Sequence, residues 1–132
     1  MSLELKRPLA FFDLETTGID PLRDKIVEIA LVRVDPDGGR EAATLRINPE
    51  RPIPAEATSV HGITDDDVSD APAFRAVARR LLDVFKDADL AGFNVRRFDV
   101  PLLDREFRDC ALDLALAERR IVDVMTIFHK KE

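Results

Sequence analysis

Residues 9–18 read L-A-F-F-D-L-E-T-T-G and give the clearest indication of the fold. It opens with four apolar residues in a row, a pattern typical of a strand that is buried on both faces. Asp13 and Glu15 follow at alternate positions, so their side chains lie on one face of the strand while Leu14 points into the core. Residues 16–18 predict the end of the strand and a turn. The stretch therefore predicts a buried strand that ends in two carboxylates.

Apolar patterning predicts the remaining elements. We expect strands over 26–34, 44–47, 89–93 and 121–122, helices over 74–85 and 98–107, a short helix starting at 64–67, and a helix after 123 that is capped by Asp123. The helix over 74–85 is the clearest, because its apolar residues recur at amphipathic spacing. The order β-β-β-α-β-α-β predicts an α/β fold, a mixed sheet of about five strands flanked by helices.

The composition is that of one globular domain. The chain has 132 residues, of which 45% are hydrophobic and 35% charged. Its apolar runs are far shorter than the roughly 20 residues of a membrane span, and no apolar leader opens the chain, so we expect no membrane segment. A single cysteine, Cys110, excludes an internal disulfide and a cysteine-rich zinc site, which favours a cytoplasmic location.

The charge is unevenly distributed. The net charge is −6, and all of it resides in residues 1–95, where 12 Lys and Arg face 18 Asp and Glu. Residues 96–132 carry 8 of each sign. This balance argues against a simple basic nucleic-acid binder. If the substrate is a polyanion, bound cations must reverse the local field.

Asp13 and Glu15 form the first candidate site. Two carboxylates held about 4 Å apart repel by roughly 4 kcal/mol at an effective dielectric near 20, so the pair needs a proton, a basic partner or a cation. Hard oxygen ligands at the end of a strand suit Mg²⁺ or Mn²⁺. An exposed acidic pair in a loop remains the alternative.

Two further segments carry candidate site residues. Asn94 ends the strand over 89–93, and Asp99 falls in the first turn of the next helix. Ligands collect at the strand ends of open α/β sheets, so Asp99 could complete a three-carboxylate cluster. An ordinary acidic residue at a helix start is the alternative. His61 lies beside Gly62, which permits a close approach of the backbone, and it is either a site residue or a structural histidine.

These segments resemble, in order, the motifs of the DEDDh 3′–5′ exonuclease family, to which the proofreading epsilon subunit of bacterial DNA polymerase III belongs. F-D-L-E-T-T-G at 12–18 resembles the first motif, V-H-G-I-T at 60–64 the substrate-site segment, and N-V-R-R-F-D at 94–99 the second motif. The match covers roughly residues 8–128. It implies a ribonuclease-H-like fold and the metal-dependent removal of nucleoside monophosphates from single-stranded DNA ends, in proofreading or repair.

The resemblance also implies residue roles. Asp13, Glu15 and Asp99 would be the catalytic residues and would hold two Mg²⁺ or Mn²⁺ ions, with Asp13 bridging both, Glu15 binding one and Asp99 supporting the other. The residues implied to bind the terminal nucleotide are Leu14, Thr16, Thr17, Glu56, His61, Asn94 and Phe98. The implied partners are a single-stranded DNA 3′ end, with RNA not excluded, and a DNA polymerase subunit.

The chain differs from the family pattern at the third motif. That motif is a His followed five residues later by an Asp, which supply the general base and the fourth metal ligand, and neither His61 nor His129 fits it. By analogy the motif lies about 40 to 50 residues further on. We therefore expect 1–132 to be a single exonuclease domain that is incomplete at its C-terminus and lacks the late helices. General-base help is worth about 10² to 10⁴ in rate, so we expect this chain alone to be nearly inactive and the full-length protein to be active.

Two other functions remain open at this point. A haloacid-dehalogenase-like phosphatase also begins with an apolar strand and D-x-D-x-T, which Asp13, Glu15 and Thr17 mimic, but its later acidic pair would have to come from Asp65–Asp67. A non-catalytic nucleic-acid-binding module of the same fold would bind single strands without cleaving them.

Overall fold

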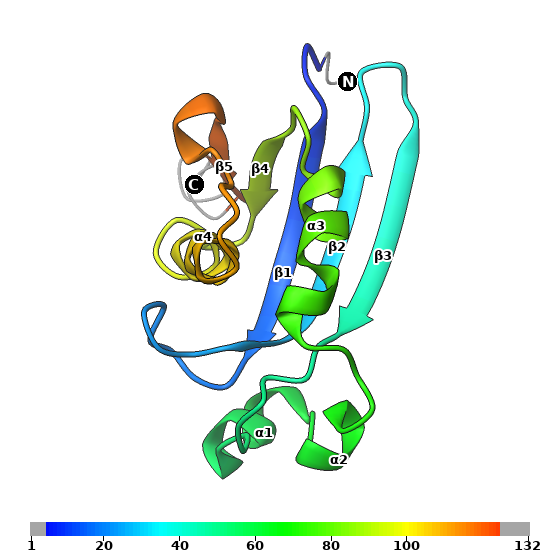
Figure 1. Ribbon diagram of the computed structural model, residues 1–132. Helices are drawn as coiled ribbons and strands as arrows, with labels where there is room; N and C mark the ends of the chain where they lie inside the picture. The colour runs from blue at the N-terminus through cyan, green and yellow to red at the C-terminus, as the bar shows by residue number, and fades with distance from the viewer. Residues whose placement is uncertain (1–4, 125–132) are drawn as a thin grey trace.

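A five-stranded mixed sheet lies at the centre of the computed structural model, which describes residues 5–124 (Figure 1). The strands are β1 Leu9–Thr16, β2 Ile26–Val34, β3 Arg40–Arg46, β4 Asp89–Gly92 and β5 Ile121–Asp123. Their order across the sheet is β3-β2-β1-β4-β5. β1, β2 and β3 form an antiparallel meander, whereas β4 and β5 run parallel to β1. The predicted mixed sheet is confirmed.

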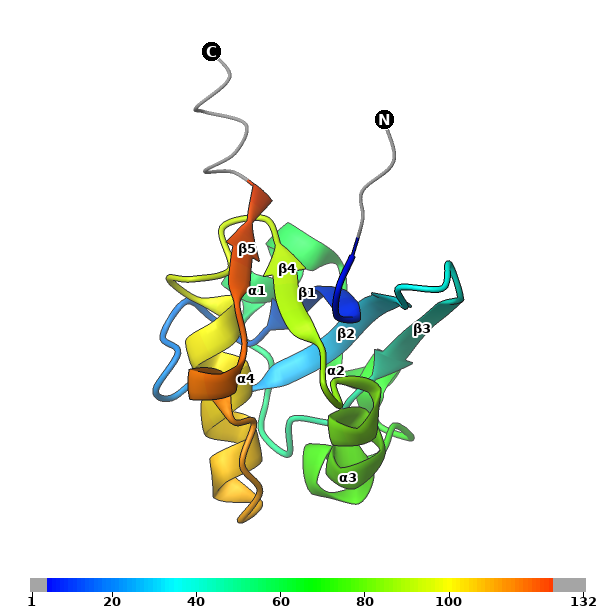
Figure 2. The same ribbon diagram turned by 90° about the horizontal axis from the view of Figure 1, so that it is seen from above.

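Two helices cover one face of this sheet, as Figure 2 shows. α3 (Phe74–Val84) and α4 (Asp99–Asp109) each bury an apolar stripe against the strands. In the core between them, the rings of Phe12 and Phe85 meet edge-on with their centroids 5.9 Å apart. The sequence predicts both helices, and each observed end lies within two residues of the predicted one.

The opposite face of the sheet is open within residues 5–124. Side chains alternate along β1, so Phe12 is buried against the helices while Phe11 is 38% exposed on the other side. Phe11 pairs with Val32 and Val32 pairs with Ala42, and these side chains line a groove of about 630 Å³. The expectation that β1 is buried on both faces is wrong. A run of apolar residues shows only that both faces of the strand are apolar.

Two short helices lie at the end of the sheet where β1 ends (Figure 1). They are α1 (Ala55–His61) and α2 (Asp65–Val68), and they pack over a second apolar cluster of Val27, Ile53, Ile63 and Val68. α2 begins at the predicted N-cap: Asp67 N–H donates to Thr64 Oγ1, and Thr64 N–H donates to the Asp67 carboxylate. The sequence does not predict α1, because none of its residues is buried and no apolar stripe marks it.

One predicted strand is longer in the structure, and one short helix was not predicted. β3 starts at Arg40, before the predicted 44–47, because it pairs with β2 as far as Val34↔Arg40 although its side chains are mostly exposed. A short 3₁₀ helix, η1 (Leu116–Glu118), precedes β5. The helix predicted after Asp123 falls largely outside the described residues. No helix within residues 5–124 is long and apolar enough to cross a membrane.

Candidate active site

Asp13 and Glu15 lie at the end of β1 on the open face of the sheet, as predicted. Glu15 stands directly opposite Glu28 of β2, whose carboxylate pairs with Arg46 at 3.1 Å. Partial burial raises the pKa of Asp13, a hydrogen bond from the Leu14 N–H lowers it, and the charge of Glu28 raises it. Partial burial also raises the pKa of Glu15, and the neighbouring Asp13 adds to this rise. The charge of Asp13 therefore opposes the ionisation of Glu15.

Asp99 is the first residue of α4 and is buried, with 8% of its surface exposed. β4 pairs with β1 only as far as Phe11↔Ala91, which leaves the next part of β1 accessible from that side. The backbone N–H of Leu14 lowers the pKa of Asp99 as it does that of Asp13. Burial, followed by the charge of Asp13, raises the pKa of Asp99 to about 7 against this effect.

The structure thus brings the three predicted carboxylates of Asp13, Glu15 and Asp99 into mutual influence. Among residues 5–124, no three His, Cys, Asp or Glu side chains are arranged closely enough to hold a metal ion as they stand. The donor set nevertheless fits a divalent cation. It consists of hard oxygen ligands. Each carboxyl has a raised pKa, which a bound cation would lower.

The loop between β4 and α4 positions Asp99. Gly92 ends β4 so close to β1 that a Cβ there would lie 2.7 Å from the backbone oxygen of Phe12. Asn94 adopts a left-handed conformation with φ of 54°, which Asn tolerates better than most residues. Asp123 accepts hydrogen bonds from the backbone N–H groups of Asn94 at 3.0 Å and of Arg96 at 3.5 Å. The carboxylate expected to cap a later helix thus holds this loop.

The two threonines after Glu15 use their hydroxyl groups inside the protein. Thr16 Oγ1 donates to Gly18 O at 2.7 Å, and Thr17 Oγ1 donates to Asp24 Oδ1 at 2.8 Å. Both residues are buried. A contact between these hydroxyl groups and a nucleotide remains a prediction.

His61 ends α1 and bonds through both ring nitrogens. Ile63 N–H donates to Nδ1 at 3.0 Å, so Nε2 carries the hydrogen and donates to Thr16 O at 3.0 Å. Gly62 follows with φ of 77°, the left-handed conformation that ends the helix. His61 therefore ties α1 to the end of β1 beside Glu15.

The other predicted substrate residues are arranged differently. The Leu14 side chain is in the core, so only its backbone faces the carboxylates. Phe98 is half-buried against the core at the N-cap of α4, and the side chain of Asn94 is exposed. Glu56 is exposed in the first turn of α1 and is not among the groups that shift the pKa values of the three carboxylates.

The acidic run Asp65–Asp67 does not supply the second acidic pair of a phosphatase. It forms α2, where Asp65 accepts from Ile53 N–H and Asp67 from Thr64 N–H. Sequence reasoning missed two polar groups near the site: the buried Glu106 of α4, which pairs with Lys25, and Asp123 as a loop anchor. Their partners are 81 and 29 residues away, so only a charged residue within an apolar pattern could have pointed to them.

Known proteins match this chain over most of its length. Residues 10–131 match the family model described as exonuclease. Over 105 residues the chain is 43% identical to a DNA polymerase III subunit epsilon-like protein of Rhodobacter capsulatus, which covers 76% of this chain and 15% of that protein. Over 108 residues it is 36% identical to DNA polymerase III subunit epsilon of Haemophilus influenzae, and this match covers 77% of this chain and 42% of that protein. The chain spans less than half the length of these relatives.

A solved structure shares the fold. E. coli exonuclease I, in complex with a dT13 oligonucleotide, matches with a TM-score of 0.83 over 95% of this chain and 29% of that one, at 20% identity. This likeness concerns the fold and agrees with the predicted ribonuclease-H-like sheet. The match to the family model over residues 10–131 shows that the chain belongs to the exonuclease family.

Proposed function

We propose that this chain carries the metal-ion site of a 3′–5′ exonuclease that removes nucleotides from single-stranded DNA. One observation carries the proposal: Asp99, with a pKa raised to about 7, lies beside the paired carboxylates at an accessible strand end. Such a cluster is unfavourable when fully ionised, and bound cations would stabilise its ionised form. Family membership makes phosphodiester hydrolysis the chemistry that would use them.

Each part of the site has a distinct task in this proposal. Asp13, Glu15 and Asp99 would hold two Mg²⁺ or Mn²⁺ ions, which when bound neutralise the phosphate and activate water. Leu14 N–H orients the carboxylates of Asp13 and Asp99. His61 holds α1 against Thr16, and with it the exposed side chain of Val60, which is 84% exposed and offers an apolar surface to a terminal base.

Single-stranded DNA is the preferred substrate in this proposal. The match to exonuclease I in complex with dT13 supports it, although only through the fold. The open end of β1 also suits an extended strand better than a duplex, because an unpaired 3′ end can reach the carboxylates alone. Arg97 is exposed two residues before Asp99 and offers a phosphate contact, whereas Arg96 donates to the backbone oxygen of Ile121. RNA remains the competing substrate, since a 2′-hydroxyl contact decides between them.

We further infer that the 132-residue chain hydrolyses DNA slowly by itself. His61 uses both ring nitrogens in hydrogen bonds, so it is not poised to accept a proton from water. His129 lies outside the described residues. Without a general base the rate should fall by about 10² to 10⁴. A DNA polymerase is the proposed partner, because relatives are named as its epsilon subunit.

Manganese titration by calorimetry tests the proposed metal site. The chain should bind Mn²⁺, Asp13→Asn should lose the binding, and Glu41→Gln on the exposed face of β3 should keep it. A 5′-labelled single-stranded oligonucleotide should then be shortened stepwise from its 3′ end, and more slowly by Asp13→Asn. Binding of DNA with no cleavage at any enzyme concentration would favour the non-catalytic module. Equal Mn²⁺ affinity in all three proteins would reject the proposed site.

A further inference from the structure

Glu106 is a carboxylate buried in the core side of α4, with 1% of its side chain exposed. Both of its oxygens are used. Lys25 Nζ lies 2.6 Å from Oε1, and the backbone N–H of Ile26 donates to Oε2 at 3.0 Å. Burying an ion is costly unless it is paired and hydrogen-bonded, and this one is both. The proposed chemistry does not use Glu106, so its burial needs another explanation.

Glu106 lies seven residues after Asp99 on α4. Seven residues make almost two full turns, so the two side chains project from the same face of the helix about 10 Å apart. That face lies against the end of the sheet where β1 ends and β2 begins. The helix therefore contacts this region at two points, through Asp99 at Leu14 and through Glu106 at Lys25 and Ile26.

The residues that Glu106 holds are themselves bound to the end of β1. Ile26 is the pairing partner of Thr16, and the register between β1 and β2 shifts between Glu15 and Thr16. Thr17 N–H donates to Lys25 O at 2.9 Å, and Lys25 N–H donates to Thr17 Oγ1 at 3.0 Å. Irregularities of this kind re-aim side chains next to functional sites. Glu106 thus holds the backbone of Ile26, whose pairing partner Thr16 is the residue after Glu15.

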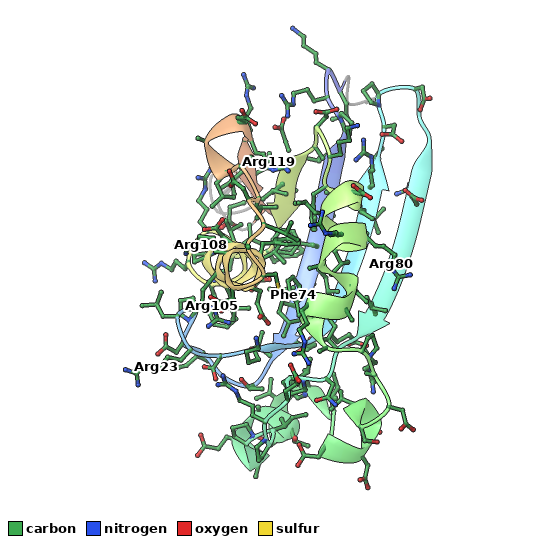
Figure 3. All side chains as sticks on the ribbon, in the orientation of Figure 1. Arg23, Phe74, Arg80, Arg105, Arg108 and Arg119 are labelled. Carbon is green, nitrogen blue, oxygen red and sulfur yellow. The ribbon has the colours of Figure 1, made fainter. Side chains whose placement is uncertain are left out.

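A second polar contact reinforces the first. Arg105, the neighbour of Glu106, donates from its guanidinium to the backbone oxygen of Asp24, and Figure 3 shows it beside the loop that joins β1 to β2. Asp24 in turn accepts from the hydroxyl of Thr17. Apolar side chains of α4 such as Leu102 and Leu103 also pack in the core, and such contacts have no direction.

We propose that the Glu106–Lys25 pair is a positioning pair that sets where α4 lies along β1 and so holds the Asp99 carboxylate in register with Asp13 and Glu15. Apolar packing tolerates a small slide of the helix, whereas charge-assisted hydrogen bonds fix both distance and direction. A metal or catalytic site needs its groups placed within about 0.5 Å. This inference rests on the proposed function, because it concerns the same carboxylate site.

The test replaces Glu106 while keeping its shape. Glu106→Gln retains a carbonyl oxygen for the Ile26 N–H and loses the charge that holds Lys25. Removing a group that orients metal ligands commonly lowers metal affinity by 10- to 100-fold, and we expect the variant to bind Mn²⁺ about tenfold more weakly than the unmodified chain. Calorimetry measures the affinity, and urea unfolding establishes that the variant is folded.

The matched control is Arg119→Met. Arg119 also makes buried polar contacts, donating to the backbone oxygens of Phe85, Ala88 and Leu114, but at the opposite end of β4 (Figure 3). Its loss should lower the free energy of unfolding and leave Mn²⁺ affinity unchanged. If Arg119→Met weakens Mn²⁺ binding as much as Glu106→Gln does, the effect is general destabilisation and the positioning role is rejected.

A measurement without metal separates this inference from the proposed function. The side-chain carboxyl carbon of Asp99 should shift its NMR resonance in Glu106→Gln and not in Arg119→Met. An unmoved resonance overturns the positioning pair, whatever the metal affinity. A moved resonance in a chain that binds no Mn²⁺ supports the pair and rejects the metal site. If Glu106→Gln does not fold, the double variant with Lys25→Met, which leaves no unpaired buried ion, is expected to show the same shift.

Discussion

Replacing Asp99 with Asn is expected to stabilise the metal-free protein at neutral pH, although it removes a proposed metal ligand. The pKa of Asp99 is about 7 in the folded protein, because the carboxyl is buried and faces Asp13. Ionisation of Asp99 therefore costs more free energy in the folded protein than in the unfolded chain. The neutral Asn keeps an oxygen that can accept the Leu14 N–H hydrogen bond and removes that cost.

The raised pKa fixes the direction and the size of the effect. The folded state binds the proton more tightly than the unfolded state, whose pKa is near 3.8. The contribution of protonated Asp99 to stability is therefore fully present below pH 3.8 and is lost as the pH rises through 7. A rise from 3.8 to about 7 corresponds to about 4 kcal/mol of unfolding free energy. We expect the free energy of unfolding of Asp99→Asn to exceed that of the unmodified chain by about 3 to 4 kcal/mol at pH 8.

Urea unfolding in EDTA at pH 4, 5, 6, 7 and 8 measures this difference directly. The difference in unfolding free energy between the two proteins should grow mainly between pH 4 and 7 and then stay constant. Mg²⁺ in place of EDTA should stabilise the unmodified chain more than the variant and so narrow the gap at pH 8. Asp83→Asn, at an exposed position on α3, serves as the control and should follow the unmodified chain. Parallel pH profiles for Asp99→Asn and the unmodified chain would refute the reasoning.

Three further predictions concern the fold that holds the site. Gly92→Ala should destabilise the protein by about 1 to 3 kcal/mol, because its Cβ would lie 2.7 Å from the Phe12 backbone oxygen; an unchanged melting temperature would contradict the close approach of β4 to β1. Phe85→Ala should cost about 3 to 5 kcal/mol in urea unfolding, since the ring is fully buried against Phe12, and a loss below 1 kcal/mol would mean that the core refills. Thr64→Ala should cost about 1 kcal/mol by removing the capping box with Asp67, and the same loss in a Thr64→Ser variant, which keeps the hydroxyl, would argue against the cap.

Local patterns predicted most of the sheet and both long helices. β2 occupies the predicted residues 26–34, because its apolar run is bounded on both sides by turn residues. α1 escaped prediction for the opposite reason. It has no buried residue and is held in part by polar contacts, in which Thr58 Oγ1 donates to Ile63 O and His61 bonds to Thr16. Polar contacts of this kind leave no periodic trace in the sequence.

The site was predictable as a set of residues but not as an arrangement. Asp13, Glu15 and Asp99 could be named because each follows or begins a recognisable element. Their proximity depends on the parallel pairing of β1 with β4, which no residue spacing specifies. The same limit applies to Glu106, whose partner Lys25 is 81 residues earlier. Sequence patterns report which face of an element is apolar, whereas long-range polar contacts are decided only when the elements meet.

The parallel pairing of β1 with β4 also governs the order in which this protein can acquire its chemistry during synthesis. β1, β2 and β3 are joined by the local connections 17–25 and 35–39, so their meander can form as soon as it leaves the ribosome. Asp99 comes 86 positions after Asp13, and closing so long a loop costs more chain entropy than closing a hairpin. A nascent chain that ends before α4 therefore has a folded meander with two carboxylates and no third. Cation binding by this site should consequently mark the completion of folding rather than its beginning.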